Sequence, residues 1–279
     1  MDPRIRLLTE ADLGFAGEVR EIAGWNQLPA DWRRFLALEP EGCFLAEWEG
    51  QPAGTATTTT YGEDLAWIGM VLVHPNFRRK GVGTALLKHA IHYLREDRGI
   101  RSVKLDATPE GLPLYEKLGF RPEWGLRRWL SRDRKGLAET GRKTERQEVS
   151  SKALALDRDI FGVDRGRLLS RLGDDAFGSV SSGDDGFGMI RDGSRACYLG
   201  PVIAITASEG EGMIRTLLGM TSSDRWVFWD IPDENRSAVA LAEALGFEPV
   251  RVLTRMWLGD NVTPGDPSRV WGLADPGLG

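Results

Sequence analysis

The chain has 279 residues, of which 41% are hydrophobic and 28% are charged, with a formal net charge of -5 at pH 7. This composition is typical of a soluble globular protein, and the acidic balance argues against a nucleic-acid-binding protein that relies on phosphate contacts. Because no stretch approaches roughly 18 consecutive apolar residues and the N-terminal residues lack the apolar core of a signal peptide, we expect a cytoplasmic protein without membrane contact, and the length predicts two domains.

The chain has few residues that could bind a metal ion or form a disulfide. The two cysteines, Cys43 and Cys197, fall in separate apolar segments outside any C-x-x-C pattern, so we interpret them as buried reduced thiols. Histidine occurs only at His74, His89 and His92, without the spacing of a metal site. We therefore predict no metal.

The N-terminal region alternates between predicted helices and strands. Residues 4–8 alternate as an edge strand does, and Thr9 with Asp12 resembles a capping box at the start of a helix. The predicted order is an edge strand at 4–8, a helix from 9 to 23, a second helix at 31–38, and a hairpin with strands at 43–48 and 53–61.

The loop between these two helices, residues 24–29, has the sequence GWNQLP. Large aromatic and amide side chains in a loop that faces a cleft suit substrate recognition, so Trp25, Asn26 and Gln27 are candidates for acceptor binding. The alternative is structural: Trp25 fills the edge of the core, while Asn26 and Gln27 form a turn. The residues favour neither interpretation.

A strand, a basic glycine loop and a helix follow one another over residues 66–87. Residues 67–73 are almost wholly apolar, and a His-Pro pair ends this strand. In the loop, Arg78, Gly81 and Gly83 form the pattern R-x-x-G-x-G, in which residues without side chains let the backbone approach a ligand. Unpaired N–H groups and the dipole of the following helix favour an anion, so we predict a phosphate or pyrophosphate site.

Two standard phosphate-binding motifs do not fit this loop. A Walker loop places lysine after its last glycine, but Lys80 precedes Gly81. A dinucleotide fingerprint needs a third glycine where Leu86 stands. The alternative to an anion site is a solvated basic turn in front of a helix.

A second informative segment is DATPEGLPLYEKLGFRPEW, residues 106–124, which follows a short predicted strand at 101–106. Pro113 suits the first turn of a helix, and Gly119 stands where a helix commonly ends. Phe120 then begins a further strand.

Together these segments resemble the GNAT superfamily of acyl-CoA-dependent N-acetyltransferases. Residues 73–87, VHPNFRRKGVGTALL, resemble the loop that binds the coenzyme A pyrophosphate, and residues 114–120, LYEKLGF, resemble the helix that carries a tyrosine near the thioester sulfur. The resemblance implies an α+β fold, in which a central twisted mixed β-sheet is flanked by helices in each half. It also implies acetyl-CoA as the co-substrate.

The resemblance implies which residues contact coenzyme A. Residues 79–84 would hold the pyrophosphate, and the strand edge at 70–73 would pair with the pantetheine arm beside a bulge near Met70-Val71. Many relatives have an asparagine before the tyrosine helix, and here Thr108 would replace part of that contact. The predicted cofactor-binding residues are Met70, Val71, Leu72, Val73, Arg78, Arg79, Lys80, Gly81, Val82, Gly83, Thr84, Thr108 and Tyr115.

Acetyl transfer to an amine requires proton movements that suggest catalytic residues. The amine must lose a proton as it attacks, and the leaving thiolate must gain one. Tyr115 is the candidate general acid to the thiolate, and the alternative is that it only packs one face of its helix. The backbone N–H of Leu72 is the candidate donor to the thioester carbonyl. For the general base we name Glu63 or Glu110, or a water relay to a backbone carbonyl.

The second half of the chain repeats the pattern of the first. Residues 241–247, LAEALGF, echo residues 114–120, and RMWL at 255–258 echoes RRWL at 127–130. We predict a catalytic GNAT domain at residues 1–132, a charged linker at 133–147 and a degenerate GNAT-like domain at 148–279.

The second copy lacks features of the first. Glu209 and Glu211 occupy its loop, where they would repel a pyrophosphate, and Ala242 stands at the position of Tyr115. We predict that this copy is catalytically silent and forms a wall of the acceptor site.

These observations predict an acetyl-CoA-dependent N-acetyltransferase that transfers an acetyl group to a primary amine of a small molecule by direct attack on the thioester. The alternatives are a coenzyme A-binding sensor or regulatory protein without turnover, and a phosphate-binding module for another nucleotide. The acceptor cannot be read from the residues, because acceptor pockets in this superfamily share no motif. The oligomeric state is open between a monomer and a homodimer.

Overall fold

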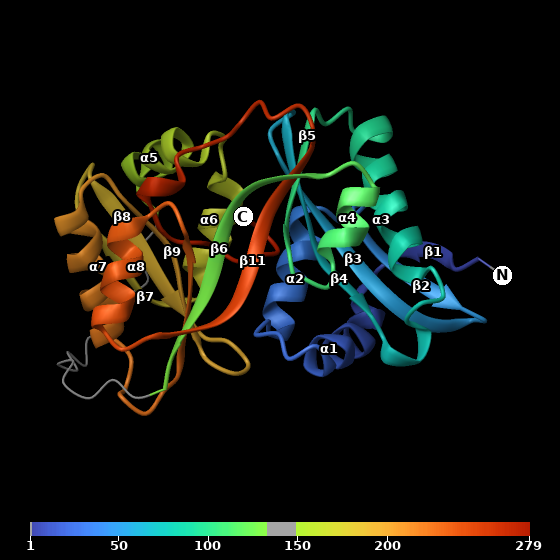
Figure 1. The fold of residues 1–279 in the computed structure, drawn as a ribbon, viewed down its shortest axis with the longest axis horizontal. Helices are drawn as coiled ribbons and strands as arrows, with labels where there is room; N and C mark the ends of the chain where they lie inside the picture. The colour runs from blue at the N-terminus through green and yellow to red at the C-terminus, as the bar shows by residue number, and fades with distance from the viewer. Residues whose placement is uncertain (1, 133–148) are drawn as a thin grey trace.

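The computed structural model describes residues 2–132 and 149–279, so the predicted linker at 133–147 lies outside the described residues. The first half follows the predicted order of elements (Figure 1). Its elements are β1 (Arg4–Leu7), α1 (Leu13–Ile22), α2 (Pro29–Leu38), β2 (Cys43–Trp48), β3 (Gln51–Tyr61), β4 (Leu65–Val73), α3 (Val82–His92), β5 (Ser102–Ala107), α4 (Leu112–Lys117) and β6 (Arg121–Ser131).

The second half repeats this order from its first helix onward, without a counterpart of β1, and adds β12 at its end. Its helix α8 and strand β11 correspond to α4 and β6, as the echo of LYEKLGF by LAEALGF predicts. Its elements are α5 (Ser151–Phe161), α6 (Gly166–Asp175), β7 (Ala176–Ser181), β8 (Gly186–Arg191), β9 (Cys197–Ala204), α7 (Ala207–Gly219), β10 (Val227–Pro232), α8 (Arg236–Ala244), β11 (Glu248–Gly259) and β12 (Val270–Gly272).

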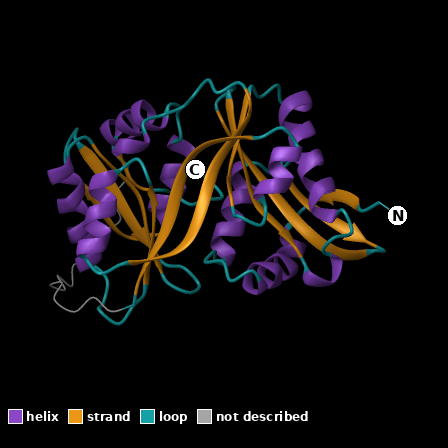
Figure 2. Ribbon diagram, in the orientation of Figure 1, coloured by secondary structure: helices purple, strands orange, loops and turns teal. Residues whose placement is uncertain are grey.

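The strands of the described residues form one twelve-stranded sheet with helices packed against it (Figure 2). The strand order is β1-β2-β3-β4-β5-β11-β6-β10-β9-β8-β7, and β12 pairs with β9. Strands β4 and β5 pair in parallel, as do β9 and β10, whereas the other pairs are antiparallel. The predicted mixed sheet flanked by helices is confirmed.

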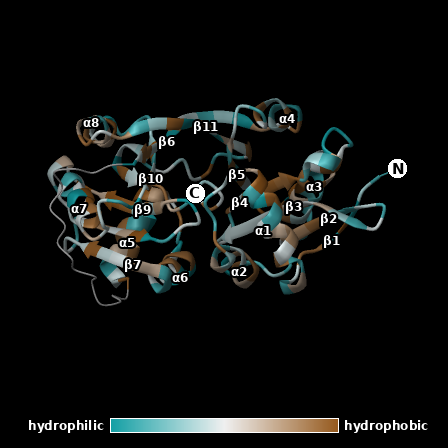
Figure 3. Cartoon of the chain, turned by 90° about the horizontal axis from the view of Figure 1, so that it is seen from below, coloured by the Kyte–Doolittle hydropathy of each residue, from teal (hydrophilic) through white to brown (hydrophobic). Residues whose placement is uncertain are grey.

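One long strand from each half, β6 or β11, crosses into the other half. Strand β6 pairs with β10 of the second half, and β11 pairs with β5 of the first half as well as with β6. Figure 3 shows β6 and β11 running together between α8 and α4. The halves proposed at 1–132 and 148–279 are therefore consecutive in sequence but exchange one strand each in space.

Two buried arginine–aspartate pairs connect the exchanged strands to their new neighbours. Arg255 of β11 donates to both carboxylate oxygens of Asp106 on β5, at 2.8 and 2.9 Å. Arg128 of β6 donates to both oxygens of Asp230 on β10, at 2.9 and 2.6 Å. Removing one partner of such a buried pair typically costs about 3–5 kcal/mol, so a shifted register would be strongly disfavoured.

The apolar core extends across the two halves. Trp32 and Phe35 of α2 pack in one cluster with Trp67 of β4, Ile160 of α5 and Leu168 of α6. A second cluster joins α3 to the opposite face of the first half, and a third joins α7 and α8 to the sheet of the second half. Each fully buried large side chain contributes about 1.5–3 kcal/mol, so the shared cluster binds the halves together.

The C-terminal residues pack against β4. The indole nitrogen of Trp67 donates to the carbonyl oxygen of Pro276 at 3.0 Å. A Cβ at Gly69 would lie 2.4 Å from the carbonyl oxygen of Gly277, so this close approach requires glycine on β4. The second half thereby contributes chain next to the centre of the first half.

Candidate active site

Strand β4 has a β-bulge just after the point where its pairing with β5 ends. Met70 and Val71 together lie opposite the single residue Ala56 in the β3–β4 register, and Met70 has a φ of 49°. Strands β4 and β5 pair at residues 65–67 of β4 and then diverge. The second part of β4 therefore borders a slot, at the position where the resemblance placed a bulge.

The bulge determines which backbone N–H groups face the slot. The Thr55 hydroxyl donates to the Met70 carbonyl oxygen at 2.8 Å, which directs that carbonyl toward β3. In a trans peptide the following N–H points the opposite way, so the N–H of Val71 faces the slot. Leu72 lies two residues before His74, whose N–H donates to a carbonyl of β3, and N–H groups two apart along a strand share a side. The N–H of Leu72 therefore faces β3 instead of the slot.

The loop before α3 leaves the first turn of that helix open. Helix α3 begins at Val82, after Gly81 with a left-handed φ of 84°. A Cβ at Gly83 would meet only the Val73 side chain, at 3.5 Å. The Arg78 side chain donates to the Val73 carbonyl oxygen at 3.2 Å, at the end of the slot. The N–H groups of the first turn of α3 have no partner within the helix, and together with the helix dipole they suit an anion at the helix N-terminus.

A groove with a volume of about 990 Å³ runs from this loop along the slot to α4. A smaller inner cavity of about 50 Å³ adjoins it. Sequence-predicted residues that line the groove are Trp25, Val71, Leu72, Val73, Arg78, Arg79, Gly81, Val82, Gly83, Thr84, Thr108, Glu110 and Tyr115. The residues that line both spaces, and so mark their junction, are Trp25, Val71, Asp106, Thr108, Tyr115 and Arg251.

Tyr115 lies at this junction with its hydroxyl available. A Cβ at Gly111 would lie 2.7 Å from the Tyr115 ring, so the glycine makes room for the ring, which packs edge-on against Phe120 with centroids 6.0 Å apart. The Tyr115 hydroxyl has no hydrogen-bond partner among the described residues. Burial raises the pKa of Tyr115 to about 12, so the phenol keeps its proton at neutral pH and can donate it.

Comparison with known proteins identifies the family. Residues 13–120 match the model of the Acetyltransferase (GNAT) family, and residues 153–272 match the model of an Acetyltransferase (GNAT) domain. The chain belongs to the GNAT family. It is an N-acetyltransferase with two GNAT domains in tandem, which confirms the predicted family and enzyme class, and the family uses acetyl-CoA.

Relatives of this GNAT protein match over most of its length. It is 25% identical over 261 residues to the holothin acyltransferase of Pseudoalteromonas sp. (strain SANK 73390), covering 91% of this chain and 87% of that protein. A solved protein of Pyrococcus horikoshii, assigned as an acetyltransferase, has the same fold with a TM-score of 0.81 at 22% identity, covering 99% and 96% of the two chains. A tandem GNAT protein from the clavulanic acid biosynthesis pathway has a TM-score of 0.66 at 15% identity, covering 92% and 98%.

Three residues predicted for the GNAT site line neither the groove nor the inner cavity. The Lys80 ammonium lies over two aromatic rings, at 5.5 and 5.3 Å from their centroids. Glu63 is exposed on the turn between β3 and β4. The Asn26 side-chain oxygen accepts hydrogen bonds from the backbone N–H groups of Arg195 and Ala196 at 3.0 and 3.1 Å, and so holds this loop of the second half.

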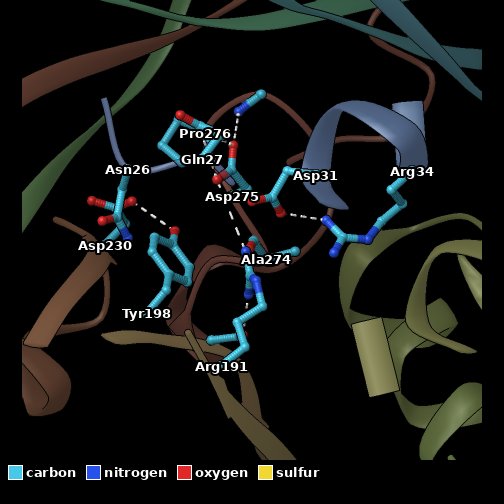
Figure 4. Close-up of polar contacts among 12 residues, drawn as sticks. Asn26, Gln27, Asp31, Arg34, Arg191, Tyr198, Asp230, Ala274, Asp275 and Pro276 are labelled. Carbon is cyan, nitrogen blue, oxygen red and sulfur yellow. Dashed lines mark hydrogen bonds and ion pairs between the residues drawn. The ribbon is translucent and has the colours of Figure 1, made fainter. Parts of the chain in front are cut away.

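Gln27 and Met70, by contrast, line the inner cavity. The Gln27 amide nitrogen lies 3.2 and 3.1 Å from the two carboxylate oxygens of Asp275 (Figure 4). Its Oε1 is buried and has no hydrogen-bond partner among the described residues. A residue that lines the inner cavity therefore carries a hydrogen-bond acceptor without a donor.

Sequence reasoning missed the wall of the cavity that the exchanged strands provide. The exchanged strands β6 and β11 contribute Arg128, Arg251 and Leu253 to the lining of the inner cavity. Asp106 of β5 and the C-terminal residues 276–277 line it as well. The repeated RRWL and RMWL segments signalled two corresponding strands, but nothing in them signalled that β11 would insert beside β5. The second half thus contributes Arg251, Leu253 and residues 276–277 to the lining of the inner cavity.

The corresponding slot of the second half is filled by the chain itself. Strands β9 and β10 pair in parallel at residues 197–199 of β9, and β12 then pairs with β9 farther along. A Cβ at Gly210 in the first turn of α7 would lie 2.0 Å from the Trp271 ring, and the Trp229 indole donates to the Trp271 carbonyl oxygen at 2.6 Å. Strand β12 takes the place along β9 that a pantetheine arm would need.

Within the described ranges, no group of three His, Cys, Asp or Glu side chains is placed to hold a metal ion. None of the helices there is long and apolar enough to span a lipid bilayer.

Proposed function

We propose that this N-acetyltransferase binds acetyl-CoA in the groove of its first half and transfers the acetyl group to a primary amine of a small molecule. The observation that carries the proposal is the junction, where a groove that starts at a helix N-terminus meets an inner cavity, lined in part by charged side chains, beside Tyr115 and Val71. The volume of about 50 Å³ suits an amine head group with a few further atoms, since one water needs roughly 10–15 Å³ on this measure.

The groove offers a suitable partner for each part of the co-substrate. The N–H groups at the start of α3 and the side chains of Arg78 and Arg79 suit the diphosphate. The slot-facing edge of β4 suits the amide groups of the pantetheine arm, because both can pair as neighbouring strands do. The thioester would then reach the junction.

Direct transfer forms a bond from the amine nitrogen to the acetyl carbon and breaks the bond from that carbon to sulfur. The N–H of Val71 faces the slot and is the proposed donor to the carbonyl oxygen, in place of Leu72. Tyr115 is the proposed donor of a proton to the departing thiolate. Glu110 lines the groove and is the proposed acceptor of the amine proton, directly or through water, whereas Glu63 lies outside it.

The proposal is tested by following free thiol release from acetyl-CoA with a panel of small primary amines. We expect release that depends on both the protein and an amine, with the acetylated amine detected by mass spectrometry. Stabilisation of the protein by coenzyme A without turnover on any amine would contradict the proposal and favour a sensor.

The hydrogen bond from Thr55 to the bulge gives a separate prediction. Thr55 is fully buried, and Thr55→Val keeps its volume but removes the donor to Met70. We expect unfolding to become easier by about 1 kcal/mol and kcat to fall about tenfold, because the Val71 peptide loses its anchor. Urea unfolding and steady-state kinetics measure these effects.

Thr59→Val is the matched control. Thr59 lies on the same strand and is also buried, but its hydroxyl has no hydrogen-bond partner among the described residues. We expect its kcat to equal that of the unmodified protein. Equal kcat values for the two variants would contradict a catalytic role of the bulge orientation.

A further inference from the structure

Arg251 brings a positive charge to the junction of the groove and the inner cavity, and it lines both spaces. It belongs to β11, the strand that the second half contributes to the first. In the β6–β11 register Arg251 lies directly opposite Arg128, next to a bulge between Pro249 and Arg251. Cross-strand partners share a face of the sheet, and the side chains of both arginines line the inner cavity.

The other arginines on this face are neutralised by partners, but Arg251 is not. Arg128 is paired with Asp230, and Arg255 with Asp106. Arg251 forms no hydrogen bond or ion pair with any described residue. Burial lowers the pKa of Arg251, as does the charge of Arg128, whereas Asp230 and Glu110 raise it. Because a guanidinium stays protonated in proteins, its charge is partly desolvated here without a counter-ion.

We propose that the acceptor amine carries a carboxylate, and that Arg251 binds this carboxylate beside Arg128. The inference rests on the proposed function, because it names the class of amine that the same site accepts. Arg128 uses its Nε and Nη2 groups to donate to Asp230. Its Nη1 group makes no hydrogen bond with the described residues and is left to bind a ligand. Planar guanidinium donors match the two oxygens of a carboxylate.

Charge balance favours a carboxylate over a phosphate. Arg251 has no ion-pair partner among the described residues, and with the carboxylate of Glu110 also acting on it, it offers at most one positive charge for a ligand to balance. A phosphate monoester carries about −1.5 to −2 at neutral pH and would leave excess negative charge close to Asp106 and Asp230. Such an excess is costly in a site that is partly shielded from water.

The other end of the acceptor has a partner in Gln27. Gln27 lines the inner cavity; its amide nitrogen is turned to Asp275, and its buried Oε1 has no hydrogen-bond partner among the described residues (Figure 4). An amine N–H donates to such an oxygen. A small amino acid in the inner cavity would therefore meet the unpaired donors of Arg251 and the side chain of Gln27, which both line this space.

The test compares matched acids and amides as acceptors at saturating acetyl-CoA. The probes are glycine and glycinamide, 3-aminopropanoate and 3-aminopropanamide, 4-aminobutanoate and 4-aminobutanamide, with 2-aminoethyl phosphate as the phosphate probe. The proteins are the unmodified chain, Arg251→Gln, Arg251→Lys and the control Arg158→Gln. Arg158 is exposed in the last turn of α5 and lines neither space. Far-UV circular dichroism and thermal unfolding verify that each variant is folded.

We expect at least one acid to have a lower KM than its amide. Arg251→Gln should raise the KM of that acid about tenfold or more while changing the KM of its amide and of acetyl-CoA little. Arg251→Lys should restore part of the preference, and Arg158→Gln should leave it unchanged. Amides equal to or better than all the acids, a preference for the phosphate probe, or a preference that survives Arg251→Gln would overturn the proposal.

Different experimental results would contradict this inference and the proposed function. Acetylation of amides and acids alike would overturn the carboxylate assignment and leave N-acetyl transfer to small amines intact. If no amine is acetylated, calorimetry with the coenzyme A-loaded protein measures acid binding directly. An acid that binds without an effect of Arg251→Gln, or acids that do not bind, would then overturn the inference as well.

Discussion

Gly83→Glu is expected to abolish the binding of coenzyme A. The new carboxylate would stand at the first turn of α3, where the diphosphate is proposed to lie. Two unit charges 4 Å apart repel by about 4 kcal/mol at the effective dielectric of a protein surface, so we expect Kd to rise on the order of 10²- to 10³-fold. The fold should tolerate the change, because a Cβ at Gly83 meets only Val73 at 3.5 Å. Calorimetric titration with coenzyme A measures the loss.

Gly212→Glu provides the same chemical change in the second half. Gly212 is exposed in α7, and nothing lies within 4 Å of a Cβ placed there. We expect this variant to bind coenzyme A as the unmodified protein does. Gly83→Gln separates charge from bulk, since it should weaken binding less than Gly83→Glu. Undiminished binding by Gly83→Glu, or a loss caused by Gly212→Glu, would contradict the location of the site.

Tyr115→Phe is expected to lower kcat by roughly 10²- to 10⁴-fold, the range typical of a positioned proton donor. The KM for acetyl-CoA should change little, because phenylalanine keeps the ring that packs against Phe120. Steady-state kinetics with any accepted amine measures both constants. Tyr93→Phe is the control: its hydroxyl bonds Glu39 at 2.8 Å and lies outside the groove, so kcat should be unchanged.

The pKa of Tyr115 gives this prediction a pH dependence. Burial raises the pKa to about 12, so the protonated, donating form persists as the pH rises past the ordinary tyrosine value near 10. We expect no decline of kcat that is attributable to Tyr115 up to about pH 11. A decline with an apparent pKa near 10 that disappears in Tyr115→Phe would contradict the buried-donor assignment, and an unchanged kcat in that variant would remove Tyr115 from the mechanism.

The residues of the candidate site differ in how far local sequence patterns predict their position. The basic glycine loop and the tyrosine helix are local patterns, and residues taken from them, such as Arg78, Gly83 and Tyr115, line one groove. The N–H of Leu72 faces β3, and Val71 is the proposed donor instead, because N–H direction alternates along a strand and the bulge at Met70 shifts this alternation by one residue. The hydrogen bond from Thr55 to the Met70 carbonyl oxygen shows which N–H groups after the bulge point away from β3.

The sequence by itself determined the family, the two related halves, the mixed sheet with its helices, and the basic glycine loop before α3, because each depends on residues close together along the chain. The tertiary structure decided that β11 lies beside β5, that Arg251 reaches the junction, and that β12 fills the slot of the second half. These arrangements join segments that lie far apart along the chain. Local propensity and periodicity describe which face of a strand is buried, but they do not specify which distant strand becomes its neighbour.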